Sequence, residues 1–258
     1  MQINNLKDFE SFYLELPEYQ YTLSEYFLKK LSEDSQLFNY RYFIKKNKFG
    51  YGEDEFMILW DLIVKSMPPT FSFCEIGVHK GQILTLIRLL ADRYQKRVMR
   101  YGVSPMNGDK TTFKGDFNLD VRVLHKNFRL ETDYVILQGY STEEPIIKKA
   151  SVHSPFDILY IDGSHRKEDV ESDFINYLPM ISDNGLLVVD DSNNNMPCTY
   201  GPPFGAGGRY WGNQDVSDVT DRFMQNNNNF VYLGSIIHNR IWKRRRIAKF
   251  EITNNHHK

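Results

Sequence analysis

The sequence predicts an α/β fold with a mostly parallel sheet, and two features predict it. The apolar runs Phe156–Ile161 and Gly185–Val189 have the length and composition of buried parallel strands, and Arg166–Met180 between them has helical spacing. Strand-like and helical segments also alternate from Phe71 onwards, until two adjacent strand-like runs follow each other. We therefore expect a Rossmann-like seven-stranded mostly parallel sheet with one antiparallel strand, helices on both faces and an N-terminal helical extension.

The N-terminal part of the chain has no strand-like alternation. Residues 1–50 are rich in Tyr, Phe, Leu and Lys, with helical spacing in Ser24–Leu31, which predicts a helical cap. Acidic residues after Gly52 then mark the first turn of a helix that runs to Met67, where two prolines stop it. We expect two parts, an N-terminal helical cap over residues 1–50 and a sheet domain over residues 51–250.

The sheet domain divides into alternating elements. The strands are expected at Phe71–Ile76, Val98–Val103, Tyr134–Gln138, Phe156–Ile161 and Gly185–Val189, and the helices at Gln82–Asp92, Val121–Phe128, Thr142–Ala150, Arg166–Met180 and Val216–Gln225. Two further strands, Phe230–Ile237 and Arg240–Ile247, are separated only by His238 and Asn239. So short a turn requires an antiparallel pair.

Composition limits the classes of function. With 258 residues, 41% hydrophobic and 25% charged, the chain fits one folded α/β domain with a modest extension. The net charge of −1 gives no attraction to polyanions, so we expect no nucleic acid partner. Only Cys74 and Cys198 occur, and no leader-like or membrane-spanning stretch is found, so we expect a cytoplasmic protein without a membrane partner.

A glycine-containing turn follows the first strand. Glu75, Gly77, Val78 and Gly81 lie between that strand and the helix that begins at Gln82. Glycines let a ligand approach the backbone, and a helix N-terminus offers unpaired N–H groups to an anion such as a carboxylate. The turn lacks the Gly-x-Gly-x-x-Gly pattern of dinucleotide sites, and the competing interpretation is that its glycines serve only a tight strand-to-helix connection.

Three acidic residues follow two neighbouring strands. Asp162 ends the first strand of the βαβ unit, and Asp190 and Asp191 end the second. Because neighbouring parallel strands lie about 4.8 Å apart, carboxylates at their ends face one crevice. They repel one another unless a cation lies between them, and Mg²⁺ is the simplest candidate. A turn-forming role would explain Asp191 alone but not Asp162, and Asn193 is a further candidate neighbour.

These segments together resemble a known family. The glycine turn, the segment Tyr160–His165 and the segment Gly185–Asp191 resemble class I S-adenosylmethionine-dependent methyltransferases, and more narrowly the metal-dependent O-methyltransferases of the macrocin and mycinamicin sugar type. The resemblance covers about residues 50–245. It implies Mg²⁺ or another divalent cation held by Asp162, Asp190 and Asp191. It also implies cofactor contacts from Glu75, Gly77, Val78, Gly81, Ser104, Gly139, Tyr140, Ser141 and Asp162.

Two positions depart from that family's pattern. Ser104 stands at the end of the second strand, where the family usually has an acid for the ribose hydroxyls, and a serine offers fewer acceptor sites. Asp109 or Asp116 from the next loop could replace that acid. Tyr140 stands where an acid is common near the adenine, and an aromatic ring could stack on the base instead.

His165 is the expected general base. Transfer of a methyl group to an alcohol requires the hydroxyl to lose its proton, and an imidazole titrates near neutral pH. The resemblance assigns this role to the matching histidine, with Asp162 as the second catalytic residue. The competing interpretation is that His165 caps the following helix or orients Asp162. His79, within the glycine turn, is expected to pack or to cap the backbone.

The region between residues 201 and 212 resembles a flap. Glycine and proline alternate there with aromatic residues, and Tyr200, Tyr210 and Trp211 are the expected contacts to a sugar ring or an aromatic acceptor. Local packing under a loop is the competing explanation.

The sequence thus predicts a Mg²⁺-dependent enzyme that methylates a hydroxyl of a sugar or glycan. The alternatives are an O-methyltransferase of a phenolic or other small molecule, a nicotinamide-dependent oxidoreductase, a cofactor-binding module without catalysis, and an RNA ribose methyltransferase. The expected role of residues 1–50 is a lid or a homodimer contact.

Overall fold

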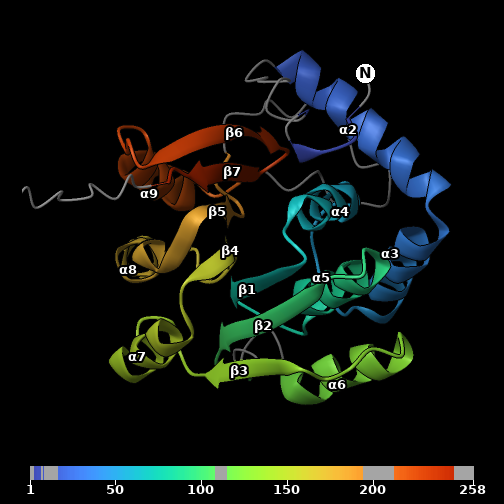
Figure 1. Cartoon of the computed structure of the whole chain (residues 1–258), viewed down its shortest axis with the longest axis horizontal. Coiled ribbons are helices and arrows are strands. Elements are labelled where there is room, and N and C mark those ends of the chain that lie inside the picture. Colours follow the sequence, from blue (N-terminus) through green and yellow to red (C-terminus); the bar gives the residue numbers. More distant parts are fainter. Residues whose placement is uncertain (1–2, 7, 9–16, 108–114, 194–211, 247–258) are drawn as a thin grey trace, which may run out of the picture.

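The computed structural model describes residues 3–6, 8, 17–107, 115–193 and 212–246. Its centre is a single seven-stranded sheet with the order β3-β2-β1-β4-β5-β7-β6 (Figure 1). The strands are β1 Thr70–Ile76, β2 Arg97–Ser104, β3 Tyr134–Gln138, β4 Phe156–Ile161, β5 Ile181–Val189, β6 Phe230–Ile236 and β7 Asn239–Arg244. β1 to β5 pair in parallel, while β7 runs antiparallel to both β5 and β6. The expected sheet with one reversed strand is confirmed.

Helices cover both faces of the sheet (Figure 1). One face packs against α4 Phe56–Ser66, α5 Gln82–Arg93 and α6 Phe117–Asn127, and the other against α7 Glu144–His153, α8 Lys167–Tyr177 and α9 Gln214–Met224. The N-terminal helices α2 Pro17–Glu33 and α3 Ser35–Asn47 join the layer of α4 and α5, and their buried side chains belong to the same hydrophobic cluster. The N-terminal helical extension is therefore observed, whereas its boundary at residue 50 stays a prediction.

Alternation along the strands explains why two separate cores form. In β1, Phe71 and Phe73 face the α4 and α5 side, while Cys74 and Ile76 face the α7 and α8 side. The next residue in the first series is Glu75, which is also buried. α4 is buried over most of its circumference because it lies between the sheet and the N-terminal helices. Both sheet faces are thus shielded from water, as a parallel sheet requires.

Several element boundaries differ from the sequence-based expectation. β5 begins at Ile181 rather than at Gly185, because Ile181 already pairs with Phe156 before an irregularity in the β4–β5 ladder. The preceding helix ends at Tyr177 and continues as the short 3₁₀ helix η1 Leu178–Met180. α6 begins four residues earlier than expected, because the carboxylate of Asp116 accepts a hydrogen bond from the amide of Leu119 and caps it.

Cys74 is a free, buried cysteine, and Cys198 lies outside the described residues. Within the described part of the chain, every helix is too short or too polar to cross a lipid bilayer.

Candidate active site

Acidic residues meet where the central strands end. Beyond the last paired residues, the amide of Gly77 donates to a carbonyl of β2, that of Asp162 to β1 and that of Asp190 to β4, each over 2.9 Å. These three hydrogen bonds extend the parallel ladders by one residue. They place Gly77, Asp162 and Asp190 side by side at the carboxyl edge of the sheet, where ligands of open α/β sheets bind.

Asp162 and Asp190 face each other across one hydroxyl group. The Tyr160 hydroxyl lies 3.0 Å from Oδ2 of Asp162 and 3.1 Å from Oδ2 of Asp190. A hydroxyl has one proton and can donate to only one carboxylate at a time. Burial, followed by the charges of Asp190, Asp191 and Glu75, raises the pKa of Asp162 well above its usual range. The negative charge at the ends of β4 and β5 is therefore only partly balanced by the neighbouring groups.

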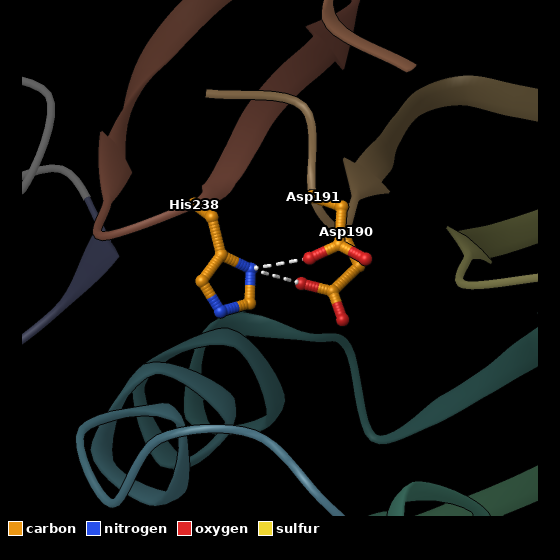
Figure 2. Close-up of side chains that lie close together, drawn as sticks. All are labelled: Asp190, Asp191 and His238. Atoms are coloured by element: carbon orange, nitrogen blue, oxygen red, sulfur yellow. Dashed lines mark ion pairs between the residues drawn. The ribbon is translucent and has the colours of Figure 1, made fainter. Parts of the chain in front are cut away.

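His238 approaches this acidic edge from the β6–β7 hairpin (Figure 2). Its Nδ1 lies 2.8 Å from Oδ1 of Asp190 and 3.1 Å from Oδ1 of Asp191, and only 3% of its side chain is exposed. The side-chain amide of Asn239 donates to the same Asp190 oxygen over 2.6 Å. The hairpin turn reaches this place because β7 is antiparallel to β5, with Arg240 opposite Val189.

Asp191 links two imidazoles. Its backbone has a left-handed φ of 53°, which turns the chain at the end of β5. Oδ1 faces His238, and Oδ2 lies 2.8 Å from Nε2 of His165, whose side chain is 41% exposed. Burial raises the pKa of Asp191, but hydrogen bonds from His165 and His238 outweigh it and lower the pKa to about 2. The hydrogen bond with Asp191 in turn raises the pKa of His165.

The donor set fits a divalent cation. Asp190, Asp191 and His238 each offer one ligand atom, and these atoms all lie within 4.8 Å of one another. Neighbouring ligands of an octahedral ion with bonds of about 2.1 Å lie about 3 Å apart, close to the spacing around Nδ1 of His238. Two carboxylates with an imidazole suit ions such as Mn²⁺ as well as Mg²⁺. Asp162 is not in this group of three but adjoins Asp190, so its expected role as a ligand stays a prediction.

The glycine turn is tightly packed against the chain itself. Gly77 has a φ of 97°, and a Cβ there would lie 1.8 Å from the carbonyl oxygen of Asp162. Gly81 precedes α5 with a φ of 84°, and a Cβ there would lie 2.6 Å from a methyl group of Val121. Val78 between them is buried. Internal packing therefore accounts for both glycines without a ligand, and their contact with a cofactor stays a prediction.

Glu75 carries an unpaired oxygen near this turn. Only 2% of the residue is exposed, and its Oε2 has no hydrogen-bond partner among the residues that the structure describes. Burial raises the pKa of this carboxyl well above its usual range, although the backbone amide of Leu84 opposes the shift. A buried oxygen without a partner is costly. It fits a nearby ligand that carries a hydrogen-bond donor, such as the amino group of S-adenosylmethionine.

The remaining expected cofactor residues lie along the ends of β2 and β3. Ser104 is buried, and its carbonyl accepts a hydrogen bond from the amide of Gly139 over 3.1 Å. Tyr140 is 62% exposed, which leaves its ring available for stacking. The carbonyl of Ser141 accepts from the Tyr177 hydroxyl over 3.1 Å. The strand order thus places these residues on the same edge as Gly77 and Asp162.

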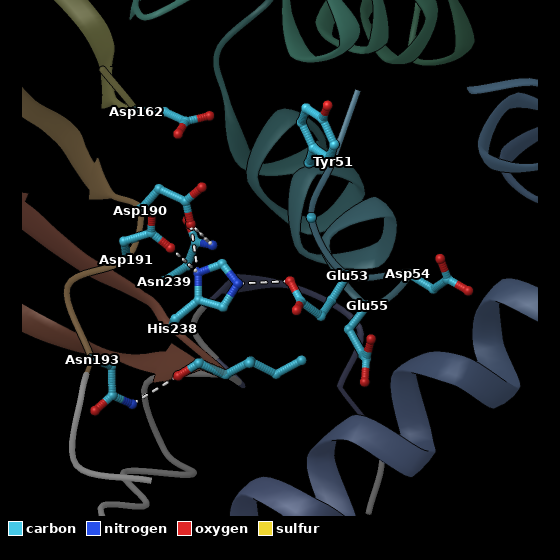
Figure 3. Close-up of polar contacts among 12 residues, drawn as sticks. Tyr51, Glu53, Asp54, Glu55, Asp162, Asp190, Asp191, Asn193, His238 and Asn239 are labelled. Atoms are coloured by element: carbon cyan, nitrogen blue, oxygen red, sulfur yellow. Dashed lines mark hydrogen bonds and ion pairs between the residues drawn. The ribbon is translucent and has the colours of Figure 1, made fainter. Parts of the chain in front are cut away.

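Other candidates have local roles or lie outside the described residues. The ring of His79 stacks on Tyr51 and meets Phe117 edge-on, which confirms the expected packing role. The side-chain amide of Asn193 donates to the carbonyl of Ile237 and points away from the acidic edge (Figure 3). Asp116 caps α6 as described above. The expected ribose neighbour Asp109 and the expected substrate contacts Tyr200, Tyr210 and Trp211 lie outside the described residues.

Four residues of this site were not expected from the sequence. They are Glu53, Tyr160, His238 and Asn239. A signal for the last two was present, since the predicted hairpin next to the last parallel strand places its two-residue turn at the end that carries Asp190 and Asp191. No sequence pattern links Glu53 to His238, which is 185 residues away.

Comparisons with known proteins agree with this architecture. Residues 74–192 match the model of a family described as a methyltransferase domain, and no curated protein matches the sequence. The fold is similar to that of a Staphylococcus aureus protein described as a caffeoyl-CoA O-methyltransferase, at 13% identity and a TM-score of 0.59, over 86% of this chain and 98% of that one. It is also similar to an O-methyltransferase from Bacillus cereus in complex with SAH, at 12% identity and a TM-score of 0.55, over 83% and 91% of the two chains.

A third similar structure is CalS11, described as a TDP-rhamnose 3'-O-methyltransferase of calicheamicin biosynthesis. It has 13% identity and a TM-score of 0.51, over 93% of this chain and 99% of that one. At such identities, similarity in structure establishes a shared fold, while the family match establishes the type of domain. Residues 74–192 thus match a methyltransferase domain, and the observed sheet order is that of the Rossmann-like methyltransferase fold.

Proposed function

We propose that the protein is a divalent-cation-dependent O-methyltransferase that methylates a hydroxyl group of a sugar or glycan. The observation that carries the proposal is the cluster of Asp190, Asp191 and His238, with His165 attached to it through Asp191. Acidic residues and a histidine at the ends of β4 and β5 provide both a cation site and a base. A methyltransferase acting on a hydroxyl needs both, because an alcohol is a very weak acid at neutral pH.

His165 is the proposed general base. Its Nε2 lies 2.8 Å from Asp191, so the carboxylate holds this nitrogen in its protonated form and leaves Nδ1 to accept a proton. Nδ1 of His165 would take the proton of the acceptor hydroxyl, and bound S-adenosylmethionine would supply the methyl group and leave as S-adenosylhomocysteine, so that the acceptor becomes a methyl ether. A divalent cation bound beside Asp190 and Asp191 would lower the pKa of the acceptor hydroxyl.

The proposed cation ligands are Asp190, Asp191 and His238, with Asp162 as the next candidate. The sequence-based set lacked His238, and the distances around its Nδ1 support adding it. The imidazole favours Mn²⁺ and similar ions more than an all-oxygen site would, so Mg²⁺ need not be the best activator.

The sugar acceptor rests on the resemblance of the segments at residues 160–165 and 185–191 and on the likeness to CalS11 over nearly the whole chain. The likeness to a protein described as a caffeoyl-CoA O-methyltransferase makes a phenolic acceptor the alternative outcome of the test. We propose a small-molecule or glycan acceptor rather than nucleic acid or membrane lipid. The free, buried thiol of Cys74 is compatible with a cytoplasmic location.

The test is a methyl-transfer screen with nucleotide-sugar, glycan and phenolic acceptors, with Mn²⁺ or Mg²⁺ and with EDTA. We expect activity on a sugar hydroxyl that EDTA abolishes. In His165→Ala the turnover should fall by about 10² to 10⁴ while S-adenosylhomocysteine still binds. His153→Ala, at the far end of α7, is the matched control and should keep full activity.

Each part of the proposal can fail separately. Turnover of His165→Ala within tenfold of wild type would contradict its role as base. Activity that survives EDTA would contradict the cation site and leave His238 as the positive group between the carboxylates. Activity on phenols alone would replace the sugar acceptor.

A further inference from the structure

Glu53 is the outermost member of the acidic edge and comes from the N-terminal side of the chain. Its Oε2 lies 2.6 Å from Nε2 of His238, the ring nitrogen that faces away from Asp190 and Asp191. Both side chains are well buried, His238 at 3% and Glu53 at 15% exposure. Figure 3 shows that Glu53 points toward His238, whereas Asp54 and Glu55 beside it point away. The imidazole is therefore held from both sides.

The segment that carries Glu53 is fixed by α3. Arg41 is buried, its Nε donates to Oδ1 of Asp54 over 2.7 Å, and its guanidinium also donates to the carbonyls of Tyr51 and Gly52. Lys45, one turn further along α3, bonds to the second oxygen of Asp54 at 3.0 Å. A planar guanidinium that bonds to several groups at once fixes the direction of the segment and not only its position.

A second attachment comes from α2. The Ser24 hydroxyl donates to the carboxylate of Glu55, and both residues are buried. Residues on both sides of Glu53 along the chain are thus tied to the N-terminal extension, while Glu53 itself is tied to the site.

From these contacts we propose that Glu53 is a positioning residue for His238 and that α2 and α3 belong functionally to the cation site. The inference rests on the proposed function, because it assumes that Nδ1 of His238 binds the cation. It also gives a role to the N-terminal extension, which the methyltransferase-domain match from residue 74 onwards does not cover.

The physical reason lies in the two nitrogens of the imidazole. An ionised carboxylate can only accept hydrogen bonds, so Glu53 holds the proton of His238 on Nε2. Nδ1 then faces Asp190 and Asp191, and a cation that displaced the proton between them would meet the lone pair of Nδ1. Carboxylates that orient a metal-binding histidine in this way typically contribute 10-fold to 100-fold in metal affinity.

The experiment measures Mn²⁺ affinity of the full-length protein by electron paramagnetic resonance, without cofactor or acceptor, in wild type, Glu53→Ala and Glu53→Gln. We expect Glu53→Ala to weaken binding about 10-fold to 100-fold and Glu53→Gln to restore most of it, because the glutamine carbonyl still accepts from Nε2. Arg41→Met should weaken binding in the same direction. Glu144→Ala, with a side chain 78% exposed on α7, is the control and should bind as wild type does.

The outcomes distinguish this inference from the proposed function. Mn²⁺ binding of Glu53→Ala within threefold of wild type would overturn the role of Glu53, while the cation site itself would stand. Equal losses in the alanine and glutamine variants would also overturn it, because the acceptor would then not matter. Wild-type affinity in Arg41→Met would overturn the part assigned to α3. No Mn²⁺ binding by the wild type would overturn the cation site and this inference together.

Discussion

Asp173 makes the stability of this protein depend on pH. It lies on the inner face of α8, is 1% exposed, and its Oδ1 has no hydrogen-bond partner among the described residues. Burial raises the pKa of Asp173 to about 7, and the charge of Asp169 acts in the same direction, against a hydrogen bond with Ser141. The folded protein therefore keeps a proton that the unfolded chain gives up near pH 4.

The sign and size of the effect follow from that difference. Below about pH 4 both the folded and the unfolded state hold the proton, so the free energy of unfolding is not yet reduced by Asp173 there. Between about pH 4 and pH 7 only the unfolded chain loses the proton, and the free energy of unfolding falls by about 1.4 kcal/mol per pH unit. The total loss is about 4 kcal/mol, of which about 2.5 kcal/mol falls between pH 5 and pH 8.

Urea unfolding of wild type and Asp173→Asn at several pH values between 5 and 8 tests this. Asparagine has no proton to lose, so the variant should lack this contribution, and the wild type should lose about 2.5 kcal/mol relative to it as the pH rises. Asp183→Asn, at the exposed start of β5, is the matched control. A difference between wild type and Asp173→Asn that stays constant with pH would refute the reasoning.

Three further predictions concern stability. Trp60→Ala should lower the free energy of unfolding by about 3 to 5 kcal/mol, measured in urea, because the buried indole packs edge-on against Phe73 and Tyr160. Gly77→Ala should lower it by at least about 2 kcal/mol, since the methyl group would overlap the Asp162 carbonyl in left-handed backbone, and an unchanged melting temperature would contradict the described turn. Mn²⁺ at 100 times its dissociation constant should add about 2.7 kcal/mol, seen as a rise in melting temperature that EDTA reverses, and no rise would argue against a cation site.

The fold could largely be predicted from local patterns. Most strands of the parallel part contain a short apolar run, and the acids that follow two of them meet because parallel ladders end at the same edge, as Asp162 and Asp190 do. The start of β5 was missed because Ser182, Asp183 and Asn184 have the composition of a turn. These residues belong to β5 because Ile181 before them pairs with Phe156, the first residue of β4. Composition does not reveal that pairing.

The site was harder to predict from the sequence than the fold, because the positions of His238 and Glu53 depend on contacts between distant segments. His238 reaches Asp190 only through the antiparallel register of β7 on β5, and a two-residue turn alone does not fix that register. Glu53 precedes a helix and looks like an ordinary first-turn acid, and only the packing of α4 under the hairpin brings it to His238. Burial of a charged group by tertiary packing is not encoded in local spacing.

The two oxygens of Asp191 face two different imidazoles, so a single side chain would connect the proposed cation site with the proposed base. A cation bound at Oδ1 would withdraw electron density from the carboxylate and weaken the hydrogen bond between Oδ2 and His165. The basicity of His165 would then fall. Without a cation at the proposed site, His165 would form a stronger hydrogen bond with Asp191 and would more often be charged. It would then be less able to remove a proton. Such an arrangement would restrain methyl transfer until the proposed site is filled, and would limit wasteful turnover of S-adenosylmethionine.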